Sequence, residues 1–375
     1  MKIKPFEIEL YFAKYEFNCK HLLCASDCES ISIDELLQLA DMPQKDLLET
    51  HLNYTESQGD PILREKIADM TADVSAEDVV FLSSPEEGIF IAMHALLDKG
   101  DHVIVVSPVY ESLLNLAEHI THNISLWPFR LKDGVWWLDE EELYRLATPQ
   151  TRLLIINFPH NPTGYLPDEA MFKRLLHWAA NKGITIFCDE MYRGLELGER
   201  KTLPSAVELN PDVIVLSGLS KTYGLPGLRS GWLIVKNPVL RDEVLNWKMY
   251  TSICATRPGE ALSLAALACR ETLAQRNRDL IQQNIAGAKP FFERWQNIFE
   301  WIPTQAGSVA LIGIKQFSAQ VFCETLAQAG ILLLPSTYMN YSDTHIRFGF
   351  GRKSFLENLK ALDAHLTKHY PEKCT

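Results

Sequence analysis

Short apolar runs alternate with longer amphipathic segments through the middle of the chain. The apolar runs lie at residues 79–82, 103–106, 153–157, 184–188, 213–216 and 233–235. Apolar positions recur with helical spacing between several of them, at residues 85–98, 110–120 and 168–181. Strands without polar alternation are typical of a parallel sheet buried on both faces, with helices as crossovers. The pattern predicts an α/β fold whose large domain is a mostly parallel sheet covered by helices.

The end of the chain predicts a second, smaller unit. A long helical region runs from Pro258 to Trp295, with a predicted break at Gly287-Ala288. Beyond it, strands at 309–314, 331–334 and 345–350 alternate with helices at 318–329 and 354–369. We therefore predict a small α+β domain and divide the chain into 1–45 (N-terminal arm and part of the small domain), 46–275 (large domain) and 276–375 (small domain).

Two segments have two readings each. Residues 6–18 form an aromatic-rich amphipathic arm, which either packs on another subunit or is the first helix of the core. Residues 126–137 form either an extra strand pair or an outer excursion. A helix at 32–40 is clearer, because Ser32 can cap it and Glu35 follows three residues later.

Composition and charge exclude several classes of protein. The chain has 375 residues, 47% of them hydrophobic and 22% charged, and a formal charge of −12. The composition is that of a globular protein, and its acidity argues against nucleic acid or an anionic membrane as the main partner. Neither a membrane span nor a signal peptide is expected from the apolar runs. The eight cysteines include no C-x-x-C pair, which favours reduced thiols, a cytoplasmic location and no metal centre.

Polar side chains follow five of the predicted strands at the point where each strand ends. They are Ser84 (followed by Pro85, which opens a helix), Tyr110, Asn161, Asp189 with Tyr192, and Lys221. Ligands of open parallel sheets bind outside the carboxyl ends of the strands, so these side chains should share one crevice. Each residue also has a purely structural explanation, since an Asp at a strand end can cap a helix and N-P-T-G can be only a turn. Their joint placement favours a ligand site.

The set suits the ring of pyridoxal phosphate. Lys221 would form a Schiff base with the cofactor aldehyde, because a partly desolvated lysine loses its proton more easily. Asp189 would keep the pyridine nitrogen protonated, and Tyr192 and Asn161 would donate to the ring oxygen. Tyr110 offers a flat face for stacking, although packing on the following helix explains it nearly as well.

The phosphate group needs a helix N-terminus and a cation. The helix that begins at Ser84-Pro85-Glu86 supplies the first, and Arg229 supplies the second. The substrate carboxylate needs two N–H donors side by side, and an arginine of the small domain would supply them best.

Five motifs together resemble the fold-type I pyridoxal-phosphate aminotransferases of class I and II over essentially the whole chain. They are N-Y-x4-G-x3-L-R at 53–64, N-P-T-G at 161–164, D-E-x-Y at 189–192, S-K-x-Y-G-x-P-G-L-R-x-G at 220–231 and I-R-F at 346–348. The resemblance implies a sheet of the seven-stranded type and a homodimer with shared active sites. It also implies that the small domain combines the N-terminal segment with the C-terminal part.

The resemblance carries roles onto matching residues. Lys221 would be the catalytic amine that moves the substrate proton, with Asp189 and Tyr192 completing the catalytic set. Arg347 would bind the substrate α-carboxylate beside Asn161. Tyr54 would reach across the dimer interface to the phosphate bound by the partner subunit.

The start of the phosphate helix departs from the family pattern, which is glycine-rich there. Pro85 has no N–H to give a phosphate, and an inward glutamate would repel it. We expect Glu86 and Glu87 to point outward, with Ser84 and Glu87 forming a capping box. Gly218 stands where many members have a phosphate-binding serine, so Ser220 is the expected substitute, with Ser217 as a second candidate.

Three further charged residues have open roles. Asp27 or Glu29, in a segment expected to close over the substrate, could recognise a cationic side chain, although a solvated loop acid is the commoner case. Arg257 could bind the distal carboxylate of a substrate in the neighbouring active site, or it could be an ordinary surface arginine.

The sequence predicts an aminotransferase that moves an amino group from an amino acid to a 2-oxo acid in two half-reactions. A pyridoxal-phosphate lyase or cyclase would use the same residues and stays open as an alternative. A non-catalytic binding protein is disfavoured, because Lys221 and Asp189 are both present. The identities of the donor and of the acceptor stay open.

Overall fold

A seven-stranded sheet forms the centre of the computed structural model, which describes residues 3–374. Its order is β2-β10-β9-β8-β7-β3-β4, and all neighbours are parallel except β10, which runs antiparallel to β2 and β9. The strands are β2 (Val79–Leu82), β3 (His102–Ser107), β4 (Ile124–Pro128), β7 (Thr151–Asn157), β8 (Thr185–Asp189), β9 (Val213–Gly218) and β10 (Gly231–Val235). The predicted fold class is confirmed.

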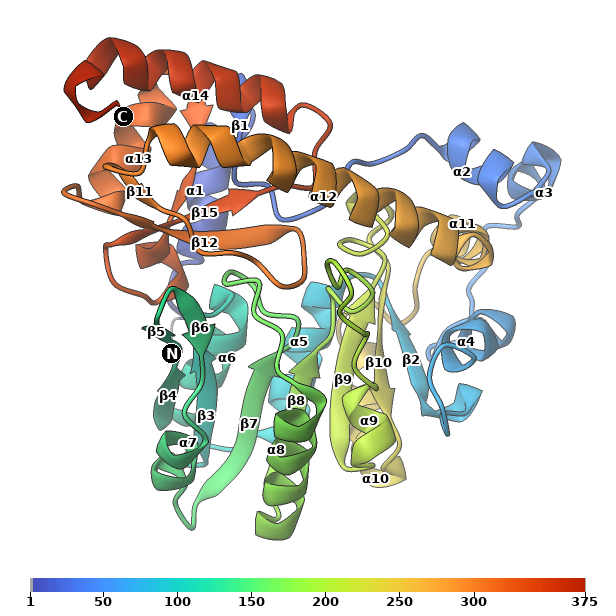
Figure 1. Cartoon of the computed structure of the whole chain (residues 1–375). Coiled ribbons are helices and arrows are strands. Elements are labelled where there is room, and N and C mark those ends of the chain that lie inside the picture. The colour runs from blue at the N-terminus through green and yellow to red at the C-terminus, as the bar shows by residue number, and fades with distance from the viewer. Residues whose placement is uncertain (1–2, 375) are drawn as a thin grey trace.

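Helices cover both faces of this sheet (Figure 1). Alternate strand residues contribute to two separate cores, which explains the continuous apolar runs: Val80 and Val105 face one side, and Phe81 and Ile104 face the other. The first side packs on α5 (Pro85–Leu96), α6 (Glu111–Thr121) and α10 (Pro238–Met249). The second packs on α4 (Pro61–Ala68), α8 (Glu169–Lys182), α9 (Ala206–Leu209) and α11 (Arg257–Ala268).

The small domain combines the two ends of the chain, as expected. An antiparallel sheet of β11 (Phe299–Glu300), β12 (Val309–Ile314), β15 (His345–Gly349) and β14 (Leu334–Pro335) packs with α13 (Ala319–Gln328) and α14 (Phe355–His369). The N-terminal strand β1 (His21–Leu22) pairs in parallel with β13 (Ile331–Leu332). The helices α2 (Ile33–Leu39) and α3 (Gln44–Leu48) lie beside α11. Short 3₁₀ turns occur at Ala76–Asp78, Pro226–Leu228, Ser336–Met339 and Pro371–Lys373.

The long helical region breaks at a different place from the one predicted. It consists of α11 and of α12 (Arg270–Arg294), which meet at Cys269, so the predicted break at Gly287-Ala288 is wrong. Gly287 lies inside α12 because that face approaches Leu356: a Cβ at this position would be 2.8 Å from the Leu356 Cδ2. Helix α12 leads from the large domain to the small one (Figure 1).

Residues 124–137 contain both of the features that were left open. The strand β4 extends the edge of the main sheet by pairing in parallel with β3. After it, β5 (Arg130–Lys132) and β6 (Val135–Trp137) form a separate antiparallel pair. The helix α7 (Glu140–Leu146) follows, with the Asp139 side chain accepting the Glu141 N–H at its start.

The N-terminal arm is a helix that packs on its own chain. In α1 (Glu7–Tyr15), the first two N–H groups donate to the Glu111 carboxylate of α6, at 3.1 Å from Glu7 and 2.9 Å from Ile8. The Tyr11 hydroxyl donates to the Leu333 carbonyl oxygen at 2.9 Å. The helix therefore links the large domain to the small one. None of the helices within residues 3–374 is long and apolar enough to cross a membrane.

Candidate active site

A cavity of about 590 Å³ lies at the carboxyl ends of β7, β8 and β9. The arm, the large domain and the small domain all contribute to its wall. Most of the predicted site residues line it: Pro85, Glu86, Tyr110, Asn161, Asp189, Tyr192, Ser220, Lys221, Arg229 and Arg347. Ser84 and Tyr54 are not among its lining residues.

Lys221 follows β9 and points its amine at the N-terminal segment. The Lys221 Nζ donates to the Ser26 Oγ at 2.8 Å. Burial is the main cause that lowers the pKa of Lys221 below its ordinary value, which favours the neutral, nucleophilic amine. The sequence analysis missed Ser26, which lies 195 positions away along the chain.

Asp189 is the last residue of β8 and is 7% exposed. Its Oδ1 accepts the Met191 N–H at 3.0 Å. Burial raises the pKa of this carboxyl from 3.8 to about 7. A cation beside the carboxylate would oppose that shift, so a protonated pyridine nitrogen fits this position.

Arg347 comes from β15 of the small domain and is 2% exposed. Its Nε and Nη2 donate to the Cys24 carbonyl oxygen at 3.2 and 2.9 Å, and its Nη1 donates to the Asn161 Oδ1 at 3.4 Å. The Tyr192 hydroxyl donates to the Ser26 carbonyl oxygen at 3.0 Å. Arg347 and Asn161 therefore meet across the two domains, as predicted, and the N-terminal segment lies directly over them.

Two glycines allow that close approach of the N-terminal segment. A Cβ at Gly349 would be 1.8 Å from the Ala25 carbonyl oxygen, and one at Gly351 would be 2.4 Å from the Asp27 backbone carbonyl oxygen. The Ser308 hydroxyl also donates to the Ser26 oxygen at 2.6 Å. The glycines that follow the I-R-F motif were the available sequence signal for this contact.

Asp27 and Glu29, which the sequence suggested as binders of a cationic side chain, form other contacts. Asp27 accepts a hydrogen bond from the Arg352 Nη2 at 2.7 Å, in an ion pair. The Glu29 Oε2 accepts the Lys353 N–H at 2.9 Å. Neither lines the cavity. They stabilise the N-terminal segment against the end of the small domain.

The start of α5 differs in part from the prediction. The Ser84 Oγ accepts the Glu87 N–H at 3.1 Å, but the Glu87 Oε2 accepts the N–H of Ser83, at 2.8 Å, rather than that of Ser84. The expected outward direction of Glu86 is wrong. Its Oε1 accepts a hydrogen bond from the Ser112 hydroxyl of α6, and the side chain lines the cavity. Burial raises the pKa of Glu86.

Gly218 is required by the packing around Pro85. A Cβ at position 218 would be 2.8 Å from the Ser230 carbonyl oxygen and 3.0 Å from the Pro85 Cγ. A Cβ at Gly231 would be 2.8 Å from the same Pro85 Cγ. A serine at 218 therefore does not fit beside this proline, so the two departures from the family pattern have one structural cause.

Three donors are left for a phosphate at this end of the cavity. The Ser220 Oγ is buried without a hydrogen-bond partner in residues 3–374, and Ser220 lines the cavity. The guanidinium of Arg229 lines it as well. Since Ser84 caps the Glu87 N–H, the Glu86 N–H is the remaining donor of the first helical turn. The orphaned hydroxyl and the cation fit an anionic group, so the residues present fit pyridoxal phosphate.

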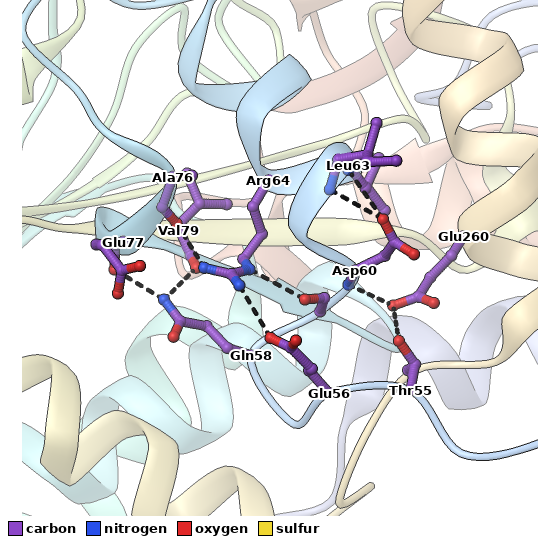
Figure 2. A network of polar contacts seen from close by, with 12 residues as sticks. Thr55, Glu56, Gln58, Asp60, Leu63, Arg64, Ala76, Glu77, Val79 and Glu260 are labelled. Carbon is purple, nitrogen blue, oxygen red and sulfur yellow. Dashed lines mark hydrogen bonds and ion pairs between the residues drawn. The ribbon is translucent and has the colours of Figure 1, made fainter.

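Tyr54 lies outside the cavity and is 83% exposed. Figure 2 shows the polar network that holds its segment. Buried Arg64 donates to the Gly59 and Ala76 carbonyl oxygens and to Glu56, each at 3.0 Å. The motif from Asn53 to Arg64 thus fixes a turn that presents Tyr54 on the surface.

Arg257 pairs within its own chain. Its Nη1 lies 3.0 Å from the Asp60 Oδ2 and 3.1 Å from the Glu260 Oε2. The other oxygen of Glu260 accepts the Thr55 hydroxyl and the Asp60 N–H (Figure 2). Arg257 therefore contributes to the same partly buried network around Thr55 and Asp60 as Glu260 does.

No cluster of His, Cys, Asp and Glu suited to a metal ion occurs among residues 3–374. The model of the family "Aminotransferase class I and II" matches residues 32–361. A probable aspartate aminotransferase of Methanocaldococcus jannaschii is 28% identical over 288 residues, which cover 70% of this chain and 75% of that protein.

Two solved structures are similar over nearly their whole length. A PLP-dependent aminotransferase of Streptococcus suis superimposes with a TM-score of 0.91 and 27% identity, covering 98% of this chain and 99% of that one. The PLP-dependent cyclase OrfR superimposes with a TM-score of 0.88 and 25% identity, covering 97% and 98%. With the family match over most of the chain, these likenesses show that the protein is an aminotransferase of the class I and II family.

Proposed function

We propose that the cavity binds pyridoxal 5′-phosphate through Lys221 and transfers an amino group from an amino acid to a 2-oxo acid in two half-reactions. The observation that carries this proposal is the meeting of Lys221, Asp189 and Arg347 in one cavity. The cofactor, when bound, would supply an aldehyde for the amine and a pyridinium ring that accepts electrons from the substrate Cα.

The residues of the chain would each do a separate task. Arg347 would hold the substrate α-carboxylate, with the Asn161 side chain beside it, and so orient the Cα–H bond. Lys221, whose pKa burial lowers, would take the Cα proton and return it as a general base and acid. Asp189 would stabilise the positive charge of the ring nitrogen, and Tyr192 would donate to the ring oxygen.

The remaining predicted residues would hold the cofactor. Tyr110 would stack on the ring face, with Ser220, Arg229 and the first turn of α5 on the phosphate. Ser84 would act through the cap of that turn. Because Pro85 has no N–H, this phosphate site offers fewer backbone donors than a glycine-rich helix start would.

Tyr54 would complete the phosphate site of a partner subunit in a homodimer. Large apolar side chains are exposed in the segment of Tyr54 and in a second segment at 249–253, which supports an interface there. They are Leu48, Leu52, Tyr54, Met249, Tyr250 and Ile253. We place the protein in the cytoplasm, on the predicted reduced thiols.

Absorbance of the purified protein tests the proposal. The wild type should absorb in the visible region, Lys221→Ala should lose that band, and the surface variant Lys201→Ala should keep it. Adding amino acids should change the spectrum, and a 2-oxo acid should restore it. A colourless wild type that gains no band with added pyridoxal phosphate would refute the proposal.

A cyclase reaction is the second candidate, because the cyclase OrfR is nearly as similar in structure as the aminotransferase. The two differ in their need for an acceptor. An aminotransferase stops after the first half-reaction without a 2-oxo acid, whereas a cyclase continues. Product analysis with and without pyruvate therefore separates them.

A further inference from the structure

Two carboxylates besides Asp189 line the active-site cavity. Glu9 comes from α1 and Glu86 from the first turn of α5. Neither forms an ion pair within the described residues; the Glu86 Oε1 accepts from the Ser112 hydroxyl instead. Burial raises the pKa of Glu86, and the charge of Glu9 adds to the effect. Carboxylates placed together destabilise one another, and the charge of Arg229 offsets this only in part for Glu86. A positive ligand group beside both acids would therefore be stabilised.

Tyr110 lies beside both carboxylates. Its hydroxyl is 3.5 Å from the Glu9 Oε1, and its ring is 5.5 Å from the ring of Phe6 at the start of the arm. Glu86 is a further hydrogen-bonding neighbour of Tyr110 and contributes to raising its pKa. Both acids therefore lie next to the hydroxyl of the residue expected to stack on the cofactor ring.

Helix α1 carries both Glu9 and a residue that lies near Arg347. Phe12 of α1 lies near Arg347, with 5.9 Å between the guanidinium carbon and the ring centroid. Glu9 precedes Phe12 by three residues, a rise of about 4.5 Å along the helix. A donor whose α-carboxylate binds Arg347 would thus extend its side chain along α1 towards Glu9.

A separate observation indicates that this cavity binds a ligand. Ser220 is 5% exposed, its Oγ has no hydrogen-bond partner in the described part of the chain, and it lines the same cavity. Buried hydroxyls are almost always hydrogen-bonded, so this one is expected to find its partner on a bound molecule. The acids therefore line a cavity that is expected to bind a ligand; Glu9 is exposed to solvent and Glu86 is half-buried.

We propose that Glu9 and Glu86 select an amino donor with a cationic side chain, an ammonium or a guanidinium at the end of an aliphatic stem. The inference rests on the proposed function and names its substrate class. Acidic donors would bring a third negative charge between two carboxylates and are disfavoured. A neutral side chain would leave both acids without a charged partner.

The test compares donors on the holoenzyme. Spectral conversion is measured with ornithine, lysine and arginine, with norvaline and norleucine as neutral controls, and with aspartate and glutamate. At least one cationic donor should exceed its neutral counterpart in kcat/KM by about ten- to hundred-fold, the range expected for a hydrogen-bonded charge contact. Aspartate and glutamate should be poorer than the cationic donor.

Variants assign the selectivity to the two acids. Glu9→Gln and Glu86→Gln should each lower the ratio of cationic to neutral kcat/KM by about ten-fold or more. Glu7→Gln, on the same helix but outside the cavity lining, should leave the ratio at its wild-type value. In calorimetry, 6-aminohexanoate should bind the wild-type holoenzyme more tightly than hexanoate does, and the two Gln variants should lose that difference.

The outcomes separate this inference from the function on which it rests. If neutral or acidic amino acids convert the cofactor as well as cationic ones, the function stands and the inference is wrong. It is equally wrong if cationic donors are preferred but neither Gln variant changes the ratio. If no amino acid converts the cofactor, both proposals fall.

Discussion

Replacing Asp189 with asparagine should stabilise the cofactor-free protein at alkaline pH, although it removes a residue assigned to the cofactor. Burial raises the pKa of Asp189 from 3.8 to about 7 in the folded chain. Between these values the folded protein keeps a proton that the unfolded chain has released. The free energy of unfolding therefore falls as the pH rises through this window.

The magnitude follows from the two pKa values. A tenfold change in proton affinity is worth about 1.4 kcal/mol, so the complete effect is of order 4 kcal/mol. Roughly 2.5 kcal/mol of it falls between pH 5 and pH 8. Asparagine is nearly isosteric and does not ionise, so its contribution is constant over the same range. Loss of the hydrogen bond from the Met191 N–H would change the free energy of unfolding by the same amount at both pH values.

Denaturant unfolding of the cofactor-free protein measures this difference. Wild type and Asp189→Asn are unfolded at pH 5 and at pH 8, and the gain from the substitution should be about 2.5 kcal/mol larger at pH 8. The exposed-site variant Asp212→Asn serves as the control. A gain that is the same at both pH values would refute the reasoning, because the carboxyl would then not be desolvated in the folded chain.

Three other substitutions test single contacts. Gly218→Ala should cost about 1–3 kcal/mol of unfolding free energy, because its Cβ meets the Ser230 carbonyl oxygen; an unchanged midpoint of thermal unfolding would contradict this. Arg64→Lys should cost about 2–3 kcal/mol in denaturant unfolding, since one ammonium cannot reach three separate acceptors. Ser26→Ala should lower kcat about ten-fold while leaving the visible cofactor band, because the Lys221 amine loses its acceptor; equal loss of both would indicate a structural role.

The fold was predictable because its signals are local. Continuous apolar strands mark a sheet buried on both faces, and alternate residues such as Val80 and Phe81 do enter opposite cores. The break of the long helix was not predictable by the same rule. A local signal at Gly287 was overridden by its packing against Leu356, a residue of another helix that no pattern within the segment reveals.

The site was predictable where a side chain follows a strand directly, as Asp189 and Lys221 do. It was not predictable where a contact depends on how distant segments meet. Ser26 meets Lys221 only because the N-terminal segment packs against Gly349 and Gly351 of the small domain. The inward direction of Glu86 likewise depends on a hydroxyl of the neighbouring helix α6.

The departures from the family pattern near the phosphate position are parts of one structural change. The Pro85 ring fills the space into which a Cβ at position 218 would project, so the same packing that removes a backbone donor also removes a serine hydroxyl. The next residue, Glu86, then turns its carboxyl into the cavity. A change that leaves fewer donors for the phosphate therefore also brings a carboxyl group into the cavity, next to the Tyr110 hydroxyl. Cofactor affinity and donor charge preference should thus be coupled in this chain through the first turn of α5.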